Sequence, residues 1–396
     1  MSTDLPFLDF ERTGFSTRSD EVIAARDQSW IAQTPYGFAV LRHREAGNIL
    51  RDRRFRQGSY HWPVRMGLKG SFARFWSNSV ISQEGAQHKA WRRLLTEALS
   101  EDFVLSLVPT FEEIAERLIA PLKKGATCEF MQDFSMPFAG MVNCALLGLP
   151  LHQWPDVSRH ASNLGLAMGL GCKENETIFN TSCDALMDLS AQLAARARND
   201  ASDQSYPARL TRAFDAAGIK EEQVLLDLIV ISIFGGVDTT KGQLGFLMTL
   251  FGDHPKEWQK LRADPDLADA AINEAIRMRP TTTWATREAV EHVVLQDIPI
   301  PQGSTVHVLS HATGTDGPVH DGHFDITAPR RIHFGFGGGA HHCIGHFLAR
   351  TDMALALKVL AGAIERFEVT QARFHPDSGN TSPIEQRLNI DWVDRC

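Results

Sequence analysis

A single cysteine lies in a glycine-rich stretch, FGGGAHHCIG, that runs from Phe336 to Gly345 and precedes a predicted helix. At such a place the positive helix end and free backbone N–H groups stabilise the anion of the thiol. Glycines let the backbone come close to the sulfur and to a flat ligand. A thiolate in this setting can be the axial ligand of a haem iron. The sequence therefore predicts that Cys343 is a metal-binding thiolate.

Three other interpretations of this stretch are possible. Residues 335–340 match a relaxed dinucleotide fingerprint, but that fingerprint needs a buried strand before it, and residues 330–333 make a poor one. A zinc site could use His341, Cys343 and His346, yet no second ligand pair has the usual spacing. A turn with a buried thiol explains the cysteine but neither the four glycines nor the two histidines. The thiolate interpretation accounts for all of them.

The stretch continues to Leu348-Ala349-Arg350 and so resembles the cysteine loop of the cytochrome P450 superfamily, FGxGx[HR]xCxG followed by xxLAR. Every fixed position of that pattern is present. The resemblance implies haem b (iron protoporphyrin IX) as cofactor, with the Cys343 thiolate as axial ligand. It also implies the family's fold, with a long oxygen-binding helix, the cysteine-ligand loop and small β-sheets.

Two further motifs agree with this resemblance in order and spacing. Glu274-Ala275-Ile276-Arg277, 69 residues before the cysteine, matches the family's ExxR motif, and charges at i and i+3 can pair on one helix face. We expect Glu274 and Arg277 to be a structural pair.

The second motif is Gly235-Gly236-Val237-Asp238-Thr239-Thr240, which resembles the family's oxygen-binding pattern [AG]Gx[DE]T[TS]. Two glycines inside a helix each cost roughly 1 kcal/mol relative to alanine, so they indicate a use other than packing. We expect Gly235 and Gly236 to loosen the helix and open space at the cofactor. The resemblance implies that Asp238 and Thr239 are the catalytic residues, which deliver protons and hold water.

Haem propionates need cationic or hydrogen-bonding partners, because buried carboxylates are costly when unpaired. Five residues match family positions that supply them. We expect the cofactor-binding set to be His88, Arg92, Arg287, His333 and His341.

The elements that must position these residues are mainly helices. Apolar spacing predicts helices over 111–123 and 184–198, a long buried one over about 221–251, and another over 344–367. β-Branched runs predict short strands over 290–295 and 305–309. A membrane span is the rival interpretation of the long helix, but its apolar run is too short and contains Asp227. The fold class is mostly α with minor β, and we expect one large domain over residues 1–396.

Composition limits the possible partners. The 40 Lys and Arg against 48 Asp and Glu give a net charge of −8, which gives no global reason to bind nucleic acid. The six cysteines are Cys128, Cys144, Cys172, Cys183, Cys343 and Cys396. None of them forms a CxxC pair with another, which indicates reduced thiols. Residues 1–11 carry acids and no long apolar run, so we expect no signal peptide, no membrane anchor and a cytoplasmic protein.

The resemblance implies an oxidoreductase, a monooxygenase that inserts one oxygen atom of O₂ into a small, largely hydrophobic organic substrate by hydroxylation or oxidative dealkylation. Electrons would come from a separate ferredoxin and ferredoxin reductase, and Lys89, Arg92 and Arg93 could form the basic docking patch. Two alternatives remain open: a peroxygenase driven by hydrogen peroxide, and a haem-binding sensor without turnover.

By position, the substrate pocket should be lined by Val80, Ile81, Ile231, Phe234, Thr282, Thr283 and Trp284. The aromatic residues Phe72, Phe75 and Trp76 are expected in the core. This set is apolar with several hydroxyls, which favours a hydrophobic substrate with a few polar groups but does not define it.

Overall fold

The computed structural model describes residues 5–169, 172–317, 320–329 and 332–393. Its helices are α1 (Asp20–Gln28), α2 (His43–Arg51), α3 (Trp62–Arg65), α4 (Ser71–Asn78), α5 (Gly85–Ala98), α6 (Glu101–Ser106), α7 (Val108–Leu122), α8 (Met136–Leu147), α9 (Trp154–Gly165), α10 (Glu176–Asn199), α11 (Tyr206–Ala216), α12 (Glu222–Asp253), α13 (Pro255–Ala263), α14 (Ala268–Met278), α15 (Ser310–Gly314) and α16 (His346–Ala363). The fold is mostly helical, as the sequence predicts.

The strands form three small sheets. They are β1 (Ile31–Thr34), β2 (Gly37–Val40), β3 (Phe55–Gln57), β4 (Thr127–Glu129), β5 (Trp284–Ala289), β6 (Val293–Leu295), β7 (Ile298–Ile300), β8 (Thr305–Leu309), β9 (Ile364–Phe374) and β10 (Pro383–Trp392). The largest sheet has the order β1-β2-β8-β5-β3, with β2 and β8 parallel. The others are β4-β10-β9 and β6-β7. The minor β portion is therefore confirmed.

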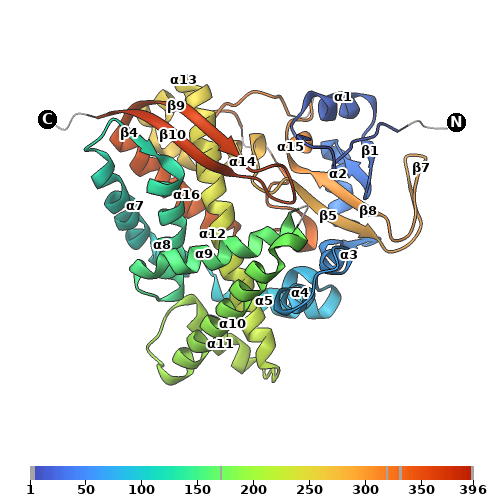
Figure 1. Cartoon of the computed structure of the whole chain (residues 1–396), viewed down its shortest axis with the longest axis horizontal. Coiled ribbons are helices and arrows are strands. Elements are labelled where there is room, and N and C mark those ends of the chain that lie inside the picture. Colours follow the sequence, from blue (N-terminus) through green and yellow to red (C-terminus); the bar gives the residue numbers. More distant parts are fainter. Residues whose placement is uncertain (1–4, 170–171, 318–319, 330–331, 394–396) are drawn as a thin grey trace.

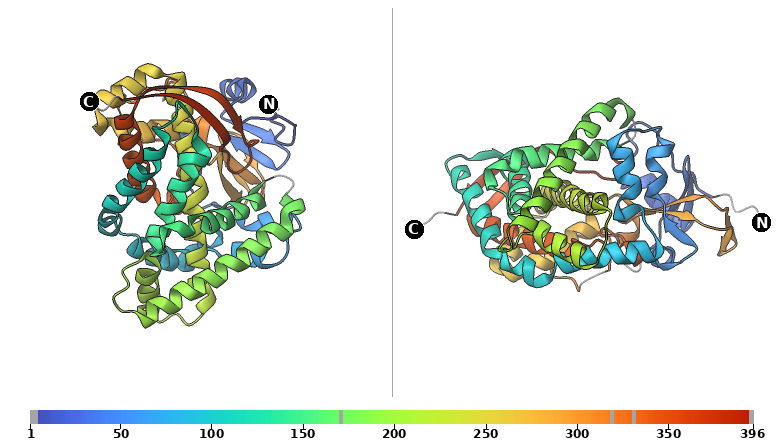
Figure 2. Two further views of the ribbon diagram at one scale, coloured as in Figure 1. Left: turned by 60° about the vertical axis from the view of Figure 1, so that its left-hand side comes forward. Right: turned by 90° about the horizontal axis from the view of Figure 1, so that it is seen from below.

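Helix α12 runs through the middle of the molecule; in the view of Figure 1, α8 to α11 lie around its middle and lower part, and the long β9–β10 hairpin crosses near its upper part (Figures 1 and 2). At 1.5 Å per residue its 32 residues span about 48 Å. It is apolar on most of its circumference, which is typical of a helix covered on all sides. The expected boundaries of 221–251 are confirmed within two residues.

Among the described residues, α12 is also the one helix long and apolar enough to cross a membrane. Half of its most apolar window is buried inside the fold, and Asp227 of the same helix is also buried. These features fit the core helix that the sequence predicts.

The main apolar core surrounds α12, and two smaller clusters lie around the β1-β2-β8-β5-β3 sheet and the N-terminal segment. The described cysteines Cys128, Cys144, Cys172, Cys183 and Cys343 are unpaired. Cys396 lies outside the described residues.

The prediction of a helix up to residue 367 was wrong at its end. Helix α16 stops at Ala363, and β9 begins at Ile364. From Ile364 onward, exposed residues roughly alternate with partly buried ones, which is typical of a strand. Pairing with β10, for example Phe367 with Ile390, stabilises this conformation. The strand expected over 290–295 is likewise shorter, because β6 covers only Val293–Leu295.

Candidate active site

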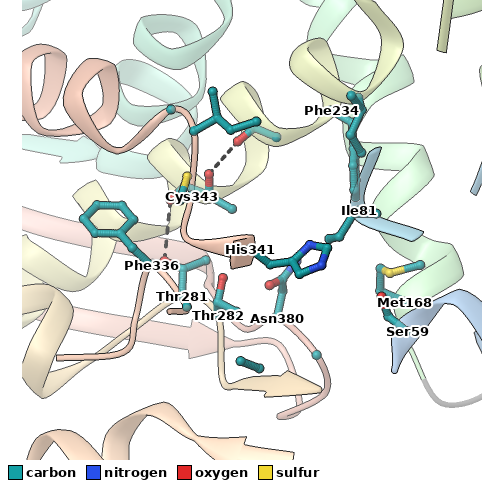
Figure 3. A pocket seen from close by; sticks show the side chains of 18 of the residues that line it. Ser59, Ile81, Met168, Phe234, Thr281, Thr282, Phe336, His341, Cys343 and Asn380 are labelled. Atoms are coloured by element: carbon teal, nitrogen blue, oxygen red, sulfur yellow. Dashed lines mark hydrogen bonds between the residues drawn. The ribbon is translucent and has the colours of Figure 1, made fainter. Parts of the chain in front are cut away.

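A cavity of about 590 Å³ lies between α12 and the loop that carries Cys343. Its walls come from α5, α8, α12, α16, the cysteine loop and a turn at residues 378–380. Figure 3 shows Cys343, His341, Phe234 and Ile81 around this space. Elements far apart in the chain therefore meet at the cysteine.

Cys343 lies three residues before the start of α16 and lines the cavity. Its backbone N–H donates to the carbonyl oxygen of Phe336 at 2.9 Å, which closes the loop (Figure 3). Burial raises the pKa of the Cys343 thiol, while the N–H of Gly345 and the charge of Arg92 act in the opposite direction. A metal ion bonded to the sulfur would hold it as the thiolate regardless of that shift.

Arg287 is a buried cation at another wall of the cavity. Its side chain donates to the carbonyl oxygens of Gly338 and Thr286, each at 3.0 Å, and the residue is only 3% exposed. Burial lowers the pKa of Arg287 to about 10, so the group is still charged near neutral pH. It forms no ion pair within the described part of the chain. A buried guanidinium of this kind fits an anionic ligand group.

Helix α5 and the cysteine loop bring three more predicted residues together. The rings of His88 and His341 lie 4.1 Å apart, centre to centre, and His341 Nε2 is 3.0 Å from Glu84 Oε1. Burial, followed by the neighbouring His341, lowers the pKa of His88 to about 4, so His88 is neutral. Arg92 donates to the carbonyl oxygen of His342. All three predicted residues line the cavity.

His333 is placed differently from the rest of the predicted set. Its Nε2 lies 3.2 Å from Asn273 Oδ1, and its Nδ1 accepts from the N–H of Gly335. It is not among the residues that line the cavity. Its ring joins the cysteine loop to α14 instead of facing the cavity.

On α12 the expected catalytic pair points in two directions. Thr239 lines the cavity, and its hydroxyl donates to the carbonyl oxygen of Gly235 at 2.7 Å. Asp238 does not line the cavity; Ser162 donates to its carboxylate at 2.5 Å and Lys241 at 2.7 Å. The carboxylate is thus tied to α9 and to its own helix.

The structure does not show the expected loosening of α12 at its glycines. The helix is continuous from Glu222 to Asp253. A Cβ at Gly235 would meet nothing within 4 Å, whereas one at Gly236 would lie 2.4 Å from Nδ2 of Asn143. The first glycine therefore leaves space at the cavity, and the second admits a side chain from α8.

Glu274 and Arg277 form a two-bond ion pair inside the fold. Arg277 Nη2 donates to Glu274 Oε1 at 2.6 Å and its Nε donates to Oε2 at 2.8 Å. The guanidinium is fully buried and also donates to the carbonyl oxygens of Gly314, Asp321 and His323. Neither residue lines the cavity. The pair joins α14 to the segment that follows α15.

Most of the expected substrate-pocket residues line the cavity: Val80, Ile81, Ile231, Phe234, Thr282 and Trp284. Thr283 does not, because its hydroxyl donates to the carbonyl oxygen of Ser378 and the residue is 1% exposed. Phe72 and Phe75 lie in the core as expected, but Trp76 also lines the cavity.

Sequence reasoning missed several lining residues: Asn143, Met168, Tyr206, Asp352 and Asn380. Polar residues within the apolar stretches of α8 and α16 were the available signal for Asn143 and Asp352. Nothing local marks the 378–380 turn, because only the β9–β10 hairpin carries it to the cavity.

Comparisons with known proteins match this arrangement. A family model described as Cytochrome P450 matches residues 173–382. The chain is 32% identical to Luteothin monooxygenase of Streptomyces thioluteus, over 91% of this chain and 90% of that one. The chain belongs to the cytochrome P450 superfamily. It is a cytochrome P450 monooxygenase, an oxidoreductase.

Other similarities agree with this membership. The chain is 27% identical to Mycinamicin IV hydroxylase/epoxidase of Micromonospora griseorubida, with 98% of each chain covered. The crystal structure of CalO2 superposes with a TM-score of 0.88 at 22% identity, over 96% of this chain and 99% of that one. That structural likeness confirms the P450 fold.

The family implies a haem-thiolate cofactor, and the residues of this cavity fit one. A cysteine sulfur faces the space, and a buried arginine that forms no ion pair with a described carboxylate lies at its wall. Gly235 leaves room on the opposite helix. A sulfur ligand, a cation for propionates and an open distal face are the features that such a group requires.

Proposed function

We propose that this chain is a haem-thiolate monooxygenase in which Cys343 binds the iron and the cavity holds a small, largely hydrophobic organic substrate. One oxygen atom of O₂ would enter the substrate, by hydroxylation or oxidative dealkylation. When bound through a thiolate, the haem supplies dioxygen activation and cleavage of the O–O bond. The single observation that carries the proposal is the joint position of the Cys343 sulfur and the buried Arg287 at one cavity.

The propionates would be held by Arg287, Arg92, His88 and His341. Arg287 offers a buried positive charge whose hydrogen bonds within the described residues go to carbonyl oxygens. Neutral His88 can donate a hydrogen bond without the cost of a second buried charge. Arg92 lies beside the cysteine loop and is half-buried. Together these groups would orient the cofactor above Cys343.

Thr239 and Asp238 would serve proton delivery on the distal side. The Thr239 hydroxyl is in the cavity, where it can hold a water molecule once it turns from the Gly235 carbonyl. Asp238 faces away, toward Ser162 and Lys241. We infer that its carboxylate takes up protons on that side and passes them inward after the contact with Lys241 opens.

The electrons would come from a separate ferredoxin and its reductase. Lys89 and Arg93 are exposed on α5, the helix whose Arg92 contacts the cysteine loop. Exposed positive charges on a helix that contacts the cysteine loop suit the docking of a small acidic protein. Reversing the charge of Lys89 and Arg93 should slow reduction by ferredoxin at low salt and leave reduction by dithionite unchanged.

The substrate pocket would be formed by Ile81, Phe234, Thr282 and Trp284, with Val80 and Ile231 beside them. These walls are mostly apolar, which favours a hydrophobic molecule. Relatives are named as monooxygenase, hydroxylase or epoxidase, which supports oxygen insertion as the reaction class.

The deciding experiment reads the sulfur–iron bond directly. Reduced protein under carbon monoxide should show the long-wavelength Soret band that is diagnostic of a thiolate ligand, and Cys343→Ala should lose it. A folded, haem-loaded wild-type protein without that band, or an alanine variant that keeps it, would overturn the proposal. Product formation with NADPH, ferredoxin and reductase separates the monooxygenase from a peroxygenase, which would need only hydrogen peroxide. Absence of product from either source would favour a sensor.

A further inference from the structure

Arg65 places a positive charge at the rim of the cavity. It is the last residue of the short helix α3, and it is exposed but also lines the cavity. Its Nη1 donates to Thr305 Oγ1 of β8 at 2.5 Å, and Thr305 is only 4% exposed. The buried hydroxyl therefore holds a long, flexible side chain against the sheet, so less side-chain entropy remains to be lost when a ligand binds.

The acid that lies closest to this guanidinium in the sheet is paired with other groups. Glu288 of β5 is directly opposite Thr305, but Arg56 donates to its carboxylate at 2.7 Å and His61 Nδ1 lies 3.1 Å from it. Within the part of the chain that the structure describes, Arg65 itself forms no ion pair. Its charge is therefore available to a ligand.

Uncharged aromatic rings form the wall of the cavity near Arg65. Burial, followed by the charge of Arg65, lowers the pKa of His307 to about 4, so this imidazole is neutral near pH 7. The ring of His307 lies 5.2 Å from that of Trp284 and 6.5 Å from that of Tyr36, centre to centre, and all three line the cavity. The Tyr36 hydroxyl donates to the exposed Glu11 at 2.9 Å, which engages that acid as well. This wall adds no charge that would compensate the guanidinium.

Helix α3 lies at a different wall of the cavity from the cysteine loop. Trp62 Nε1, at the start of α3, donates to the carbonyl oxygen of Ala167 at 2.6 Å, which ties the helix to the segment that carries Met168. In the view of Figure 3, Met168 and Ser59, which precedes α3 by three residues, lie across the drawn space from Cys343. A molecule that reaches from Cys343 to Arg65 would pass walls that are mostly apolar.

We propose that Arg65 binds an anionic oxygen group, a carboxylate or a phosphate, at one end of the substrate, while the apolar remainder of the molecule extends toward Cys343. Thr305 engages Nη1 of the guanidinium, so the edge formed by Nε and Nη2 is left for two parallel hydrogen bonds to such a group. Thr305 is a positioning residue, since it acts through Arg65. The inference rests on the proposed function, because it names the substrate class of the same cavity.

The test is the binding of two homologous series, straight-chain alkyl carboxylates and alkyl phosphates, to the haem-loaded protein. Each acid is compared with the primary alcohol of the same chain length. Isothermal titration calorimetry gives the Kd without relying on the iron, and the Soret shift reports whether the apolar end reaches it. At the best chain length, one of the two acids should bind on the order of 10-fold more tightly than its alcohol, and the tighter acid identifies the anionic group. Alcohols that bind as tightly as both acids at every length would overturn the inference.

Variants at the rim assign the preference to Arg65. Arg65→Ala should remove most of the difference between acid and alcohol, and Arg65→Lys should keep part of it, because an ammonium retains the charge but not the two-bond geometry. Thr305→Val should weaken acid binding by less than Arg65→Ala does. The matched control is Arg53→Ala, which removes the same charge from an exposed residue that does not line the cavity. An unchanged preference in Arg65→Ala, or an equal loss in Arg53→Ala, would refute the site.

The carbon monoxide band separates failure of this inference from failure of the proposed function. If the wild type shows the thiolate band but binds acids no more tightly than alcohols, the proposed function stands and the role of Arg65 is wrong. If the wild type lacks the band, the proposed function is wrong whatever the acids do. Arg65→Ala and Arg53→Ala should both keep the wild-type band, which shows that the haem site is intact when their affinities are compared.

Discussion

Replacing Arg287 by leucine should have opposite effects on the haem-free and the haem-loaded protein. Among the described residues, the buried guanidinium donates to the carbonyl oxygens of Thr286 and Gly338, and burial lowers its pKa to about 10. At about 1.36 kcal/mol per pKa unit, a depression of this size costs the charged form about 3 kcal/mol. Because the pKa is depressed, that cost is present at every pH below about 10. Arg287→Leu should therefore stabilise the haem-free protein by up to about 3 kcal/mol.

In the haem-loaded protein the same variant should be harmful. Without the guanidinium, a propionate at this wall would lose its buried cationic partner, and removing one partner of a buried ion pair costs about 3–5 kcal/mol. Since each 1.4 kcal/mol is a factor of ten, haem should dissociate at least on the order of 100-fold faster. The assay is the transfer of haem to an excess of a scavenging haem protein, followed by stopped-flow absorbance. Urea unfolding of the haem-free protein measures the other half of the prediction.

The matched control is Arg26→Leu. Arg26 is also a buried arginine that donates to a carbonyl oxygen, that of Ala312, and to the hydroxyl of Thr315, but it lies away from the cavity. That variant should destabilise both forms alike and leave the rate of haem loss unchanged. The reasoning fails if Arg287→Leu loses haem at the wild-type rate, or if its haem-free form is destabilised as much as that of Arg26→Leu.

Three further predictions follow from other groups. Arg277→Leu should lower the free energy of unfolding by about 3–5 kcal/mol in urea titrations, because Glu274 is left buried and unpaired; a change under about 1 kcal/mol would contradict this. Asp238→Asn should slow O₂-driven turnover on the order of 100-fold and leave the carbon monoxide band intact; unchanged turnover would remove Asp238 from the mechanism. Burial raises the pKa of Asp227 to about 6, above its value in the unfolded chain, so the free energy of unfolding should fall as pH rises from about 4 to about 6 and stay lower above that. The variant Asp227→Asn should not show this fall. Urea unfolding of both proteins at about pH 4 and about pH 8 tests this, and an equal pH dependence of the two would refute it.

Local patterns predicted the elements whose residues carry their own structural signal. The continuous apolar character of α12 places it within two residues, and the β-branched run at Thr305–Leu309 matches β8. The end of α16 was missed because Ile364 belongs to a strand whose partner, β10, lies about twenty residues further along the chain. A helix–strand boundary that depends on a distant partner leaves little trace in local periodicity.

The residues of the candidate site likewise fall into those that a local motif predicts and those that only distant packing places. Residues inside motifs, such as Cys343, Arg287 and Thr239, lie at the cavity, because each motif combines a side chain with the backbone that places it. Asn143 and Asn380 were missed, because their exposure to the cavity depends on how α8 packs on α12 and on where the β9–β10 turn lies. Thr283 was included by proximity alone, and its hydroxyl turns toward Ser378 instead.

The glycines of the cysteine loop serve packing as much as they serve a cofactor. A Cβ at Gly339 would lie 2.0 Å from the carbonyl oxygen of Leu50, and its φ of +66° itself favours glycine. A Cβ at Gly335 would lie 2.4 Å from Ile276 on α14. The loop is thus confined between α2 and α14 by contacts that need no ligand, and Arg277 anchors α14 in turn. Because these contacts do not involve the sulfur, packing against α2 and α14 itself helps to hold Cys343 at the cavity wall, and each such contact reduces the conformational entropy that ordering the loop would cost.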